Sequence, residues 1–297
     1  MNFITKIVGA LRAVASHPLN RQRRFKAILE YGFIQSAARL VPGDICVGFP
    51  NCTRLLVPPR MKGAAHYIAP RLCEFEAMAF VMHFLRPDEG FADVGANIGA
   101  FTVIAAGVAG AKVTAFEPVP ETFHQLELNI RLNGLGDRVQ TLNAALGQKE
   151  GTIQFTAGLG TENYAITGKP AADAVTVKVM TLDQVLAEKA PALLKVDVEG
   201  FETEVFAGAS RTLKQSQLRA MIVERTDNGS RYGFDEATLH QNIRNQGFVP
   251  CAYHPFERRV SPIAETAQGN IIYVRNASEC NAILHDAPPF KLDELSV

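Results

Sequence analysis

The sequence predicts a protein of the α/β class, in which helices cover both faces of a mostly parallel sheet. Three observations support this prediction. Strand-like apolar segments alternate with helical patterns along most of the 297 residues. A strand at 91–94 runs into a glycine turn and then into a helix. A second strand, at 112–117, ends on an acidic residue about 20 positions after that turn.

The glycine turn reads Asp93-Val94-Gly95-Ala96-Asn97-Ile98-Gly99, and an apolar helical pattern starts directly after it. Gly95 permits the sharp turn that ends the strand, and Gly99 lets the helix start close to the sheet. A helix N-terminus offers unpaired N–H groups and partial positive charge to an anionic ligand group. A strand, a glycine turn and a helix in this order begin a Rossmann-like nucleotide-binding unit.

The acidic residue is Glu117, at the end of the β-branched and apolar run that starts at Lys112, and Pro118 ends this strand. In such sheets, an acid at this spacing binds the hydroxyl groups of a ribose, because both strand ends open into one crevice. The turn and Glu117 together predict an adenosine-type ligand.

The turn also indicates which adenosine cofactor is bound. A dinucleotide turn has a middle glycine that lets the backbone approach the pyrophosphate, whereas this chain has Asn97 there. Asp93 would place a negative charge near the same phosphates. S-adenosylmethionine has no phosphate, and its ammonium group suits a neighbouring acid. We therefore favour S-adenosylmethionine over a nicotinamide cofactor.

The remaining patterns divide the chain into three parts. We expect an N-terminal extension of helix and β-hairpin at 1–71, a main domain at 72–276 and a loose C-terminal tail at 277–297. A loop at 158–172, rich in glycine and small polar residues, is a candidate active-site flap. Further strands of the main domain are expected at 138–146, 152–156, 175–179, 193–198, 218–224, 248–253 and 271–274.

Polar residues stand at or near the ends of the predicted parallel strands. Because ligands bind outside the carboxyl ends of such strands, these side chains should face one crevice. Asn143 and Ala144, after the third strand, are expected to lie against the adenine. The residues placed at this edge are Asp93, Glu117, Asn143, Asp197 and Glu224.

The stretch Lys195-Val196-Asp197-Val198-Glu199-Gly200 is unusual, because a buried parallel strand should be apolar throughout. Buried acids cost free energy unless they are paired or bind a ligand. Asp197 is therefore a candidate contact to the cofactor or the acceptor, and Glu199 a candidate general base. The structural alternatives are an ion pair between Lys195 and Asp197, and a Glu199 that merely precedes a helix.

Two other residues are candidate bases for an acceptor hydroxyl group, which must lose its proton during methyl transfer. Glu224 ends the fifth strand, with an ion pair to Arg225 as its structural alternative. His254 follows the penultimate strand. No cluster of His, Asp or Glu has metal-ligand spacing on one element, so no metal is predicted.

Composition excludes some classes of function. Basic and acidic residues number 30 each, so overall charge does not indicate a nucleic-acid partner. The five cysteines are widely spread and suggest thiols in a reducing compartment, so we expect a cytoplasmic protein. Lys6 and Arg12 interrupt the apolar N-terminus, which therefore does not resemble a signal peptide.

The basic N-terminal helix has two interpretations. It could make a weak contact with an anionic membrane surface, since Arg21, Arg23, Arg24 and Lys26 follow it. The interpretation favoured from the sequence is a helix packed on the domain with a solvated basic turn.

Four motifs in this order resemble the FkbM family of S-adenosylmethionine-dependent methyltransferases. They are DVGANIG at 93–99, AFEP at 115–118, NIRLNG at 129–134 and KVDVEGFE at 195–202, and the resemblance covers about 72–275. It implies a Rossmann-like (class I) methyltransferase with a mostly parallel seven-stranded sheet. It also implies cofactor roles for Asp93, Gly95, Asn97, Gly99 and Glu117, with Asp197 lining the pocket.

The resemblance further implies O-methylation of a hydroxyl group on a sugar, a glycan or a secondary metabolite. It leaves the acceptor unnamed, and we expect the first 70 residues, as a cap, and the 158–172 loop to select it. Two alternatives remain open: a nicotinamide-dependent oxidoreductase, and a methyltransferase-like module that binds without catalysing transfer.

Overall fold

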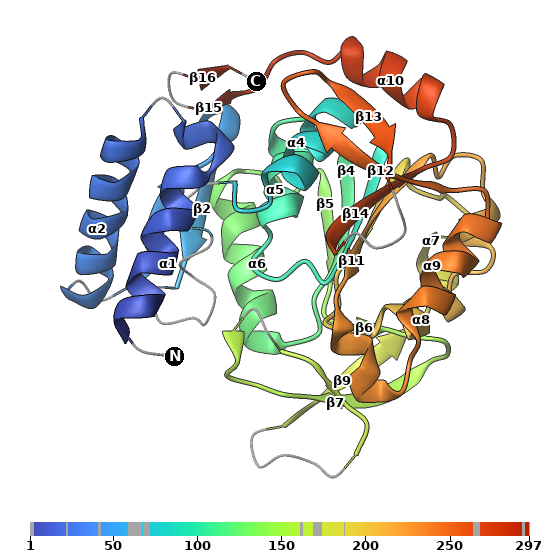
Figure 1. Ribbon diagram of the computed structural model, residues 1–297. Helices are drawn as coiled ribbons and strands as arrows, with labels where there is room; N and C mark the ends of the chain where they lie inside the picture. Colours follow the sequence, from blue (N-terminus) through green and yellow to red (C-terminus); the bar gives the residue numbers. More distant parts are fainter. Residues whose placement is uncertain are drawn as a thin grey trace.

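A sheet of eight strands, counted over the residues that the structure describes, forms the centre of the protein (Figure 1). The structure is a computed structural model that describes residues 3–21, 23–40, 43–58, 67, 72–160, 163–168, 174–186, 188–263, 268–292 and 295–296. The strand order is β13-β12-β14-β11-β10-β3-β4-β5.

Five neighbouring strands of this sheet are parallel: β3 (Gly90–Val94), β4 (Lys112–Phe116), β5 (Val139–Leu142), β10 (Leu193–Val196) and β11 (Ala220–Arg225). Each strand of the other edge runs antiparallel to its neighbour: β14 (Gly269–Val274), β12 (Val249–His254) and β13 (Arg259–Pro262). The predicted mostly parallel sheet is confirmed, and β13 is a strand beyond the seven expected.

The chain leaves the middle of the sheet in two directions. From β3 it proceeds outward through β4 to β5, and it then returns to β10 on the other side of β3. The order therefore reverses between β3 and β10. In open α/β sheets, ligands bind at this point, outside the carboxyl ends of the strands.

Helices cover both faces of the sheet. Successive residues of a strand point to opposite faces, so both faces carry apolar side chains on which helices pack. Phe91 of β3 packs in one apolar core, and Ala92 and Val94 pack in the other. The first core includes residues of α4 (Phe75–Phe84), α5 (Ala100–Gly107), α6 (Pro120–Leu132) and α10 (Ala277–His285). The second includes residues of α7 (Leu182–Leu186), α8 (Glu202–Ala207) and α9 (Glu236–Asn245).

A second sheet of four described strands follows β5. Its order is β6-β9-β7-β8. The strand expected at 138–146 is therefore divided between two sheets, because the N–H of Ala144 bonds to the carbonyl oxygen of Leu142 in a tight turn. The bounds are β6 (Ala145–Leu146), β7 (Gly151–Phe155), β8 (Ala165–Ile166) and β9 (Val175–Met180).

The described residues of the N-terminal extension form two helices and a hairpin, in agreement with the predicted helix and hairpin. They are α1 (Phe3–Ser16) and α2 (Arg24–Leu40), followed by β1 (Ile45–Gly48) and β2 (Arg54–Val57). Two short 3-10 turns, η1 (Pro18–Asn20) and η2 (Pro50–Cys52), lie between them. Within the described parts of the chain, no helix combines the length and the apolar character of a membrane span.

Two asparagines, Asn129 of α6 and Asn133 at its C-terminal cap, attach the hairpin to the main domain. The side chain of Asn133 donates to the carbonyl oxygen of Arg54 (2.7 Å) and accepts from its N–H (2.8 Å). Asn129 bonds in the same way to both backbone groups of Leu56. The NIRLNG motif therefore provides polar side chains that satisfy the open edge of β2.

The C-terminal part differs from the loose tail expected after residue 276. The side chain of Asn276 accepts hydrogen bonds from the N–H groups of Ser278 and Glu279, and so caps α10. Cys280 and Leu284, one helical turn apart, are buried in the core. Short strands β15 (Lys291–Leu292) and β16 (Leu295–Ser296) follow. In the described residues this segment therefore packs on the main domain, through one face of α10 and through Phe290 and Leu292 beyond it.

Candidate functional site

A cavity of about 640 Å³ lies at the carboxyl ends of β3, β4, β10 and β11. Residues from the glycine turn, from the ends of β4 and β10 and from β11 form one side of it. Residues of α1 and α2 and residue Tyr67 form another part of the wall. Of the residues singled out from the sequence, Gly95, Asn97, Glu117, Ala144, Asp197, Glu199 and Glu224 line this cavity.

The glycine turn is held to the neighbouring strand by its backbone. The N–H groups of Gly95 and Ala96 both donate to the carbonyl oxygen of Phe116, at 3.0 and 2.9 Å. Asn97 has φ +52°, and its side chain accepts from the N–H of Ile98 (2.8 Å), which stabilises this left-handed conformation. Asn97 therefore shapes the turn where a dinucleotide site would have glycine.

Gly95 and Gly99 are both required by their surroundings. Gly95 has φ +78°, and a Cβ added there would lie 1.8 Å from the carbonyl oxygen of Asp197. Gly99 has φ +91°, and its Cβ would lie 2.6 Å from Cδ1 of Leu126 on α6. Close packing at Gly99 is thus against a neighbouring helix, rather than against the sheet as expected.

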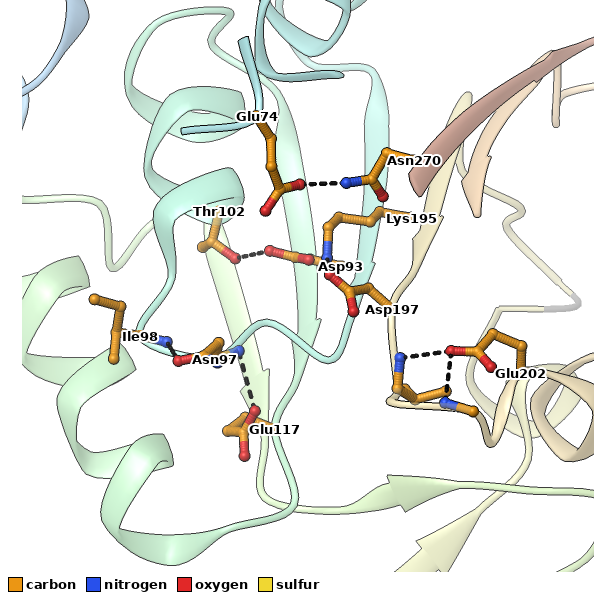
Figure 2. Close-up of polar contacts among 12 residues, drawn as sticks. Glu74, Asp93, Asn97, Ile98, Thr102, Glu117, Lys195, Asp197, Glu202 and Asn270 are labelled. Atoms are coloured by element: carbon orange, nitrogen blue, oxygen red, sulfur yellow. Dashed lines mark hydrogen bonds and ion pairs between the residues drawn. The ribbon is translucent and has the colours of Figure 1, made fainter. Parts of the chain in front are cut away.

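Glu117 closes the turn from the end of β4 (Figure 2). Its two carboxylate oxygens accept hydrogen bonds from the N–H of Asn97 (3.0 Å) and the N–H of Val119 (2.9 Å). Burial raises the pKa of Glu117 to about 7, against the effect of these two bonds. Each oxygen keeps a second lone pair for a ligand hydroxyl group.

Asp93 lies deeper, with no solvent-exposed surface. One oxygen, Oδ2, accepts from the hydroxyl of Thr102 (2.7 Å), and the other, Oδ1, has no partner among the described residues. Burial raises the pKa of Asp93, while the charge of Lys195 acts in the opposite direction. A buried oxygen without a partner is costly unless a ligand or an ion satisfies it.

Lys195 and Asp197 form the ion pair that the sequence allowed, with Nζ and Oδ2 2.9 Å apart. The lysine is 2% exposed and lies over the ring of Phe101, 4.8 Å from its centroid. Burial alone would lower the pKa of Lys195, but neighbouring carboxylates, that of Asp197 foremost, raise it well above its usual value. The pairing leaves Asp197 at the cavity wall.

Glu74 lies near this group of acids and is hydrogen-bonded to the side chain of Asn270 (Figure 2). Burial raises its pKa, and the charge of Lys195 opposes this shift. Lys195 thus stands among three carboxyl groups, those of Asp93, Asp197 and Glu74.

The turn after β10 is built by Glu202. Its Oε1 accepts from the N–H of Val198 (3.0 Å) and the N–H of Gly200 (3.3 Å). Glu199 has φ +56°, an uncommon conformation for a side chain of this size, and its carboxylate accepts from the side chain of Asn228 (3.0 Å). The terminal acid of the KVDVEGFE motif therefore positions Glu199 at the cavity.

Glu224 lines the cavity from the end of β11. Burial, and then the charges of Asp197 and Glu199, raise its pKa. Its Oε2 is buried and has no partner among the described residues. Among the cavity acids Asp197, Glu199 and Glu224, Glu224 thus has an oxygen that no described protein group contacts.

Four candidates from the sequence lie outside the cavity lining: Asp93 and Gly99, described above, and Asn143 and His254. Asn143 donates from its side chain to the carbonyl oxygens of Glu117 (2.8 Å) and Pro118 (3.0 Å), so it fixes the end of β4. The imidazole of His254 is bonded to the hydroxyl of Ser261 on the β12–β13 hairpin (2.9 Å). A contact of Asn143 with the adenine stays a prediction.

Sequence reasoning did not find the cavity residues of the N-terminal extension. Val14 of α1, His17 just after it, Tyr31 of α2 and Tyr67 all line the cavity. The extension was expected to cap the acceptor, but no local motif singles out these side chains. The expected 158–172 flap contributes Gly160 and Asn163, while its residues 161–162 and 169–172 lie outside the described residues.

In the described residues, no group of three or more His, Cys, Asp or Glu side chains is placed to hold a metal ion. The acids at the cavity are instead arranged around Lys195 and the backbone N–H groups described above.

The sheet order, the glycine turn and the acid-lined cavity define a protein of the class I methyltransferase fold. A family model described as "Methyltransferase FkbM domain" matches residues 93–250, more than half of the chain. The chain belongs to this family.

Two curated relatives are named methyltransferases. The chain is 32% identical over 159 residues to the hexuronic acid methyltransferase AglP of Haloferax volcanii, covering 51% of this chain and 62% of the relative. It is 33% identical over 167 residues to the methyltransferase sdnD of Sordaria araneosa, covering 44% of this chain and 64% of that protein. The chain thus spans less than two thirds of the length of either relative.

Solved structures also resemble this chain. The C-terminal domain of precorrin-6Y C5,15-methyltransferase from Rhodobacter capsulatus has a TM-score of 0.38 and 14% identity, covering 68% of this chain and 87% of that domain.

Proposed function

We propose that this protein is an S-adenosylmethionine-dependent methyltransferase that transfers a methyl group to a neutral hydroxyl group of a small molecule or glycan. Family membership supports methyl transfer. The observation that carries the cofactor assignment is the pair of buried acids, Asp93 and Glu117, on either side of the glycine turn.

These residues fit the cofactor chemically. S-adenosylmethionine carries a sulfonium and an ammonium group, and the carboxylate of Asp197 at the cavity wall is an anionic partner for them, with the buried carboxyl group of Asp93 adding negative charge nearby. The free lone pairs of Glu117 suit ribose hydroxyl groups. A pyrophosphate at this turn would be repelled by the negative charges of Asp93, Glu117 and Asp197. These acids therefore disfavour a dinucleotide cofactor.

When bound, the cofactor supplies a methyl group already activated by its positive sulfur. The protein must then orient the acceptor, exclude water and receive the hydroxyl proton. Residues of α1 and α2 line the cavity and contribute apolar surface to its wall. The candidate acceptors of this proton are Asp197, Glu199 and Glu224.

The contacts of these three acids favour Glu224. Asp197 is paired with Lys195, and Glu199 is hydrogen-bonded to Asn228. Glu224 has a buried oxygen without a partner in the described residues, and its raised pKa makes its carboxylate a stronger base.

The cavity lining supports an uncharged acceptor. Among the described residues that line it, Lys195 is the single lysine or arginine, and it is already paired with Asp197. His17 accepts from the N–H of Leu19 through Nδ1 and faces the carbonyl oxygen of Leu72 through Nε2, and burial lowers its pKa. A carboxylate such as that of a hexuronic acid, the substrate in the name of the Haloferax relative, would meet mainly acids.

Calorimetric titration with S-adenosylhomocysteine, in parallel with NAD, tests the cofactor. We expect binding of S-adenosylhomocysteine alone, weakened at least tenfold in Glu117→Ala because ribose hydroxyl groups lose their acceptor. Glu121→Ala, an exposed acid on α6, is the matched control and should bind normally.

Other outcomes would replace the proposal. Binding of NAD alone would indicate a nicotinamide-dependent oxidoreductase. Binding of S-adenosylhomocysteine without turnover on any hydroxylated acceptor would indicate a non-catalytic module. Unchanged affinity in Glu117→Ala would place the cofactor elsewhere.

A further inference from the structure

The outward side of α2 is unusually apolar. Phe25, Leu29, Phe33 and Leu40 are 76%, 58%, 76% and 82% exposed. At 100° per residue these four side chains fall within one quarter of the helix circumference, and we call them the apolar row. Exposed apolar patches of this kind mark interaction sites.

The opposite side of α2 packs against the protein. Ala27 is buried, Ile34 contacts the main core, and Tyr31 lines the cavity. Figure 1 shows α2 as the outermost helix at the left of the molecule, beside α1. The apolar row is therefore an outer surface, and the inner contacts of α2 do not use it.

Basic residues surround this helix. The first 43 residues contain seven lysines and arginines and one acidic residue, Glu30, whereas the rest of the chain contains 23 basic and 29 acidic residues. A chain with no net charge thus has a strongly positive N-terminal part. The basic residues that are exposed on described elements here are Arg12, Arg21, Arg24 and Lys26.

We propose that the apolar row of α2 docks on the surface of a membrane that contains anionic phospholipids. An interfacial helix places large apolar residues at the acyl boundary and basic residues at the headgroups. Phe25 lies between Arg24 and Lys26 at the start of α2, so apolar and basic groups meet there. The row runs for about 22 Å, at 1.5 Å per residue from Phe25 to Leu40, and would lie along the surface.

The charge favours a membrane over a second copy of the chain. A symmetric dimer through the apolar row would bring two positive segments together, and like charges across an interface are unfavourable. An anionic bilayer instead attracts lysine and arginine residues within a Debye length. The proposal is independent of the methyltransferase activity, because its test needs neither cofactor nor acceptor.

Co-sedimentation of the full chain with vesicles tests the proposal. We expect binding to vesicles of phosphatidylcholine with about one third phosphatidylglycerol, weakened by salt, and at least tenfold weaker binding to phosphatidylcholine alone. Replacing the row by Phe25→Ser, Leu29→Ser and Phe33→Ser should weaken binding at least tenfold. Vesicle binding should also weaken when the exposed basic charges are removed by the substitutions R12Q, R21Q, R24Q and K26Q.

Matched controls separate this surface from general effects of charge and exposure. The substitutions K149Q, K178Q, K189Q and K214Q remove as many exposed charges elsewhere, and L132S with V249S removes exposed apolar side chains elsewhere. Both controls should bind vesicles like the unmodified chain. All variants should keep their affinity for S-adenosylhomocysteine and their thermal midpoint within a few degrees.

Three results would overturn the proposal. The first is absence of binding to anionic vesicles. The second is equal loss of binding in the K149Q, K178Q, K189Q and K214Q control. The third is a dimer in sedimentation velocity that the serine substitutions convert to a monomer, which would make the apolar row an interface between copies.

Discussion

Gly95 and Asp197, from motifs far apart in the sequence, are in direct backbone contact. A Cβ at Gly95 would lie 1.8 Å from the carbonyl oxygen of Asp197. The parallel pairing of β3 with β10 places Asp93 opposite Lys195, so both strand ends turn at the same level. The cofactor turn and the acid-rich strand end therefore form one rigid unit.

Gly95→Ala should disrupt this unit. The clash is with a backbone atom, and φ is +78°, so relief requires separating the two strand ends. We expect a loss of stability of about 3 kcal/mol or more, as for a mutation that strains a special backbone position, and loss of S-adenosylhomocysteine binding. Urea denaturation and calorimetry measure both.

Gly134→Ala is the control for this substitution. Gly134 also has a positive φ, +64°, but its Cβ would meet nothing within 4 Å. It should cost about 1–2 kcal/mol from backbone strain alone and leave ligand affinity unchanged. Similar effects of the two alanines would show that steric contact with Asp197 is unimportant.

Glu202→Gln should change how stability depends on pH. Burial raises the pKa of Glu202 from 4.5 to about 7, so the folded protein keeps a proton that the unfolded chain releases. Stability should therefore fall as pH rises from about 4.5 to about 7, by an amount on the order of 3 kcal/mol. The amide oxygen of glutamine can accept the same two backbone hydrogen bonds without titrating.

Urea denaturation at pH 5 and pH 8 checks this prediction. Wild type should lose stability between the two values more than the glutamine variant does. Glu202→Leu, which cannot accept either hydrogen bond, should be destabilised at both pH values. Equal losses of stability between pH 5 and pH 8 in wild type and Glu202→Gln would contradict the raised pKa of Glu202.

Lys195→Met should be strongly destabilising. The substitution removes the buried partner of Asp197 and leaves several neighbouring acids without a positive charge, a change that typically costs 3–5 kcal/mol. Lys112→Met, on the exposed end of β4, removes a lysine whose Nζ is 3.9 Å from Asp88 and should change stability by less than about 1 kcal/mol. Chemical denaturation at neutral pH compares them, and equal small effects would mean that the ion pair is not needed.

Glu224→Gln should lower turnover by about 10²-fold or more, without weakening cofactor binding, if Glu224 receives the hydroxyl proton. Because burial raises its pKa, wild-type kcat/KM should increase with pH as Glu224 ionises, and this dependence should disappear in the variant. The pH profile is measured with the first acceptor that supports turnover. If this pH dependence disappears in Glu199→Gln and persists in Glu224→Gln, Glu199 is the residue that receives the proton.

The sequence was sufficient to predict the parts of the site that depend on local order. The glycine turn and Glu117 follow from a strand-turn-helix pattern and a fixed spacing, and the structure places both at the cavity. The role of Glu202 could not be predicted in this way. It caps a turn through Val198 and Gly200, and only the folded backbone shows which N–H groups are free.

Contacts between distant segments were the least predictable. Tyr31 and Val14 line the cavity from α2 and α1, and Asn129 and Asn133 attach the hairpin that follows these helices to the main domain. At the C-terminus, Pro288 and Pro289 suggested a loose tail, although the cap at Asn276 and the spacing of buried residues indicate a helix. The prediction gave weight to the two prolines and overlooked the short amphipathic pattern of α10 before them.

The walls of the cavity come from two separate stretches of the chain. The glycine turn, Glu117 and the acids through Glu224 lie within the matched family region, 93–250, whereas Val14, His17 and Tyr31 lie well before it. We expect the first 70 residues and the 158–172 loop together to select the acceptor, and Gly160 and Asn163 of that loop also line the cavity. Exchange of both segments between homologues should therefore change the acceptor and keep the cofactor residues of the glycine turn and Glu117.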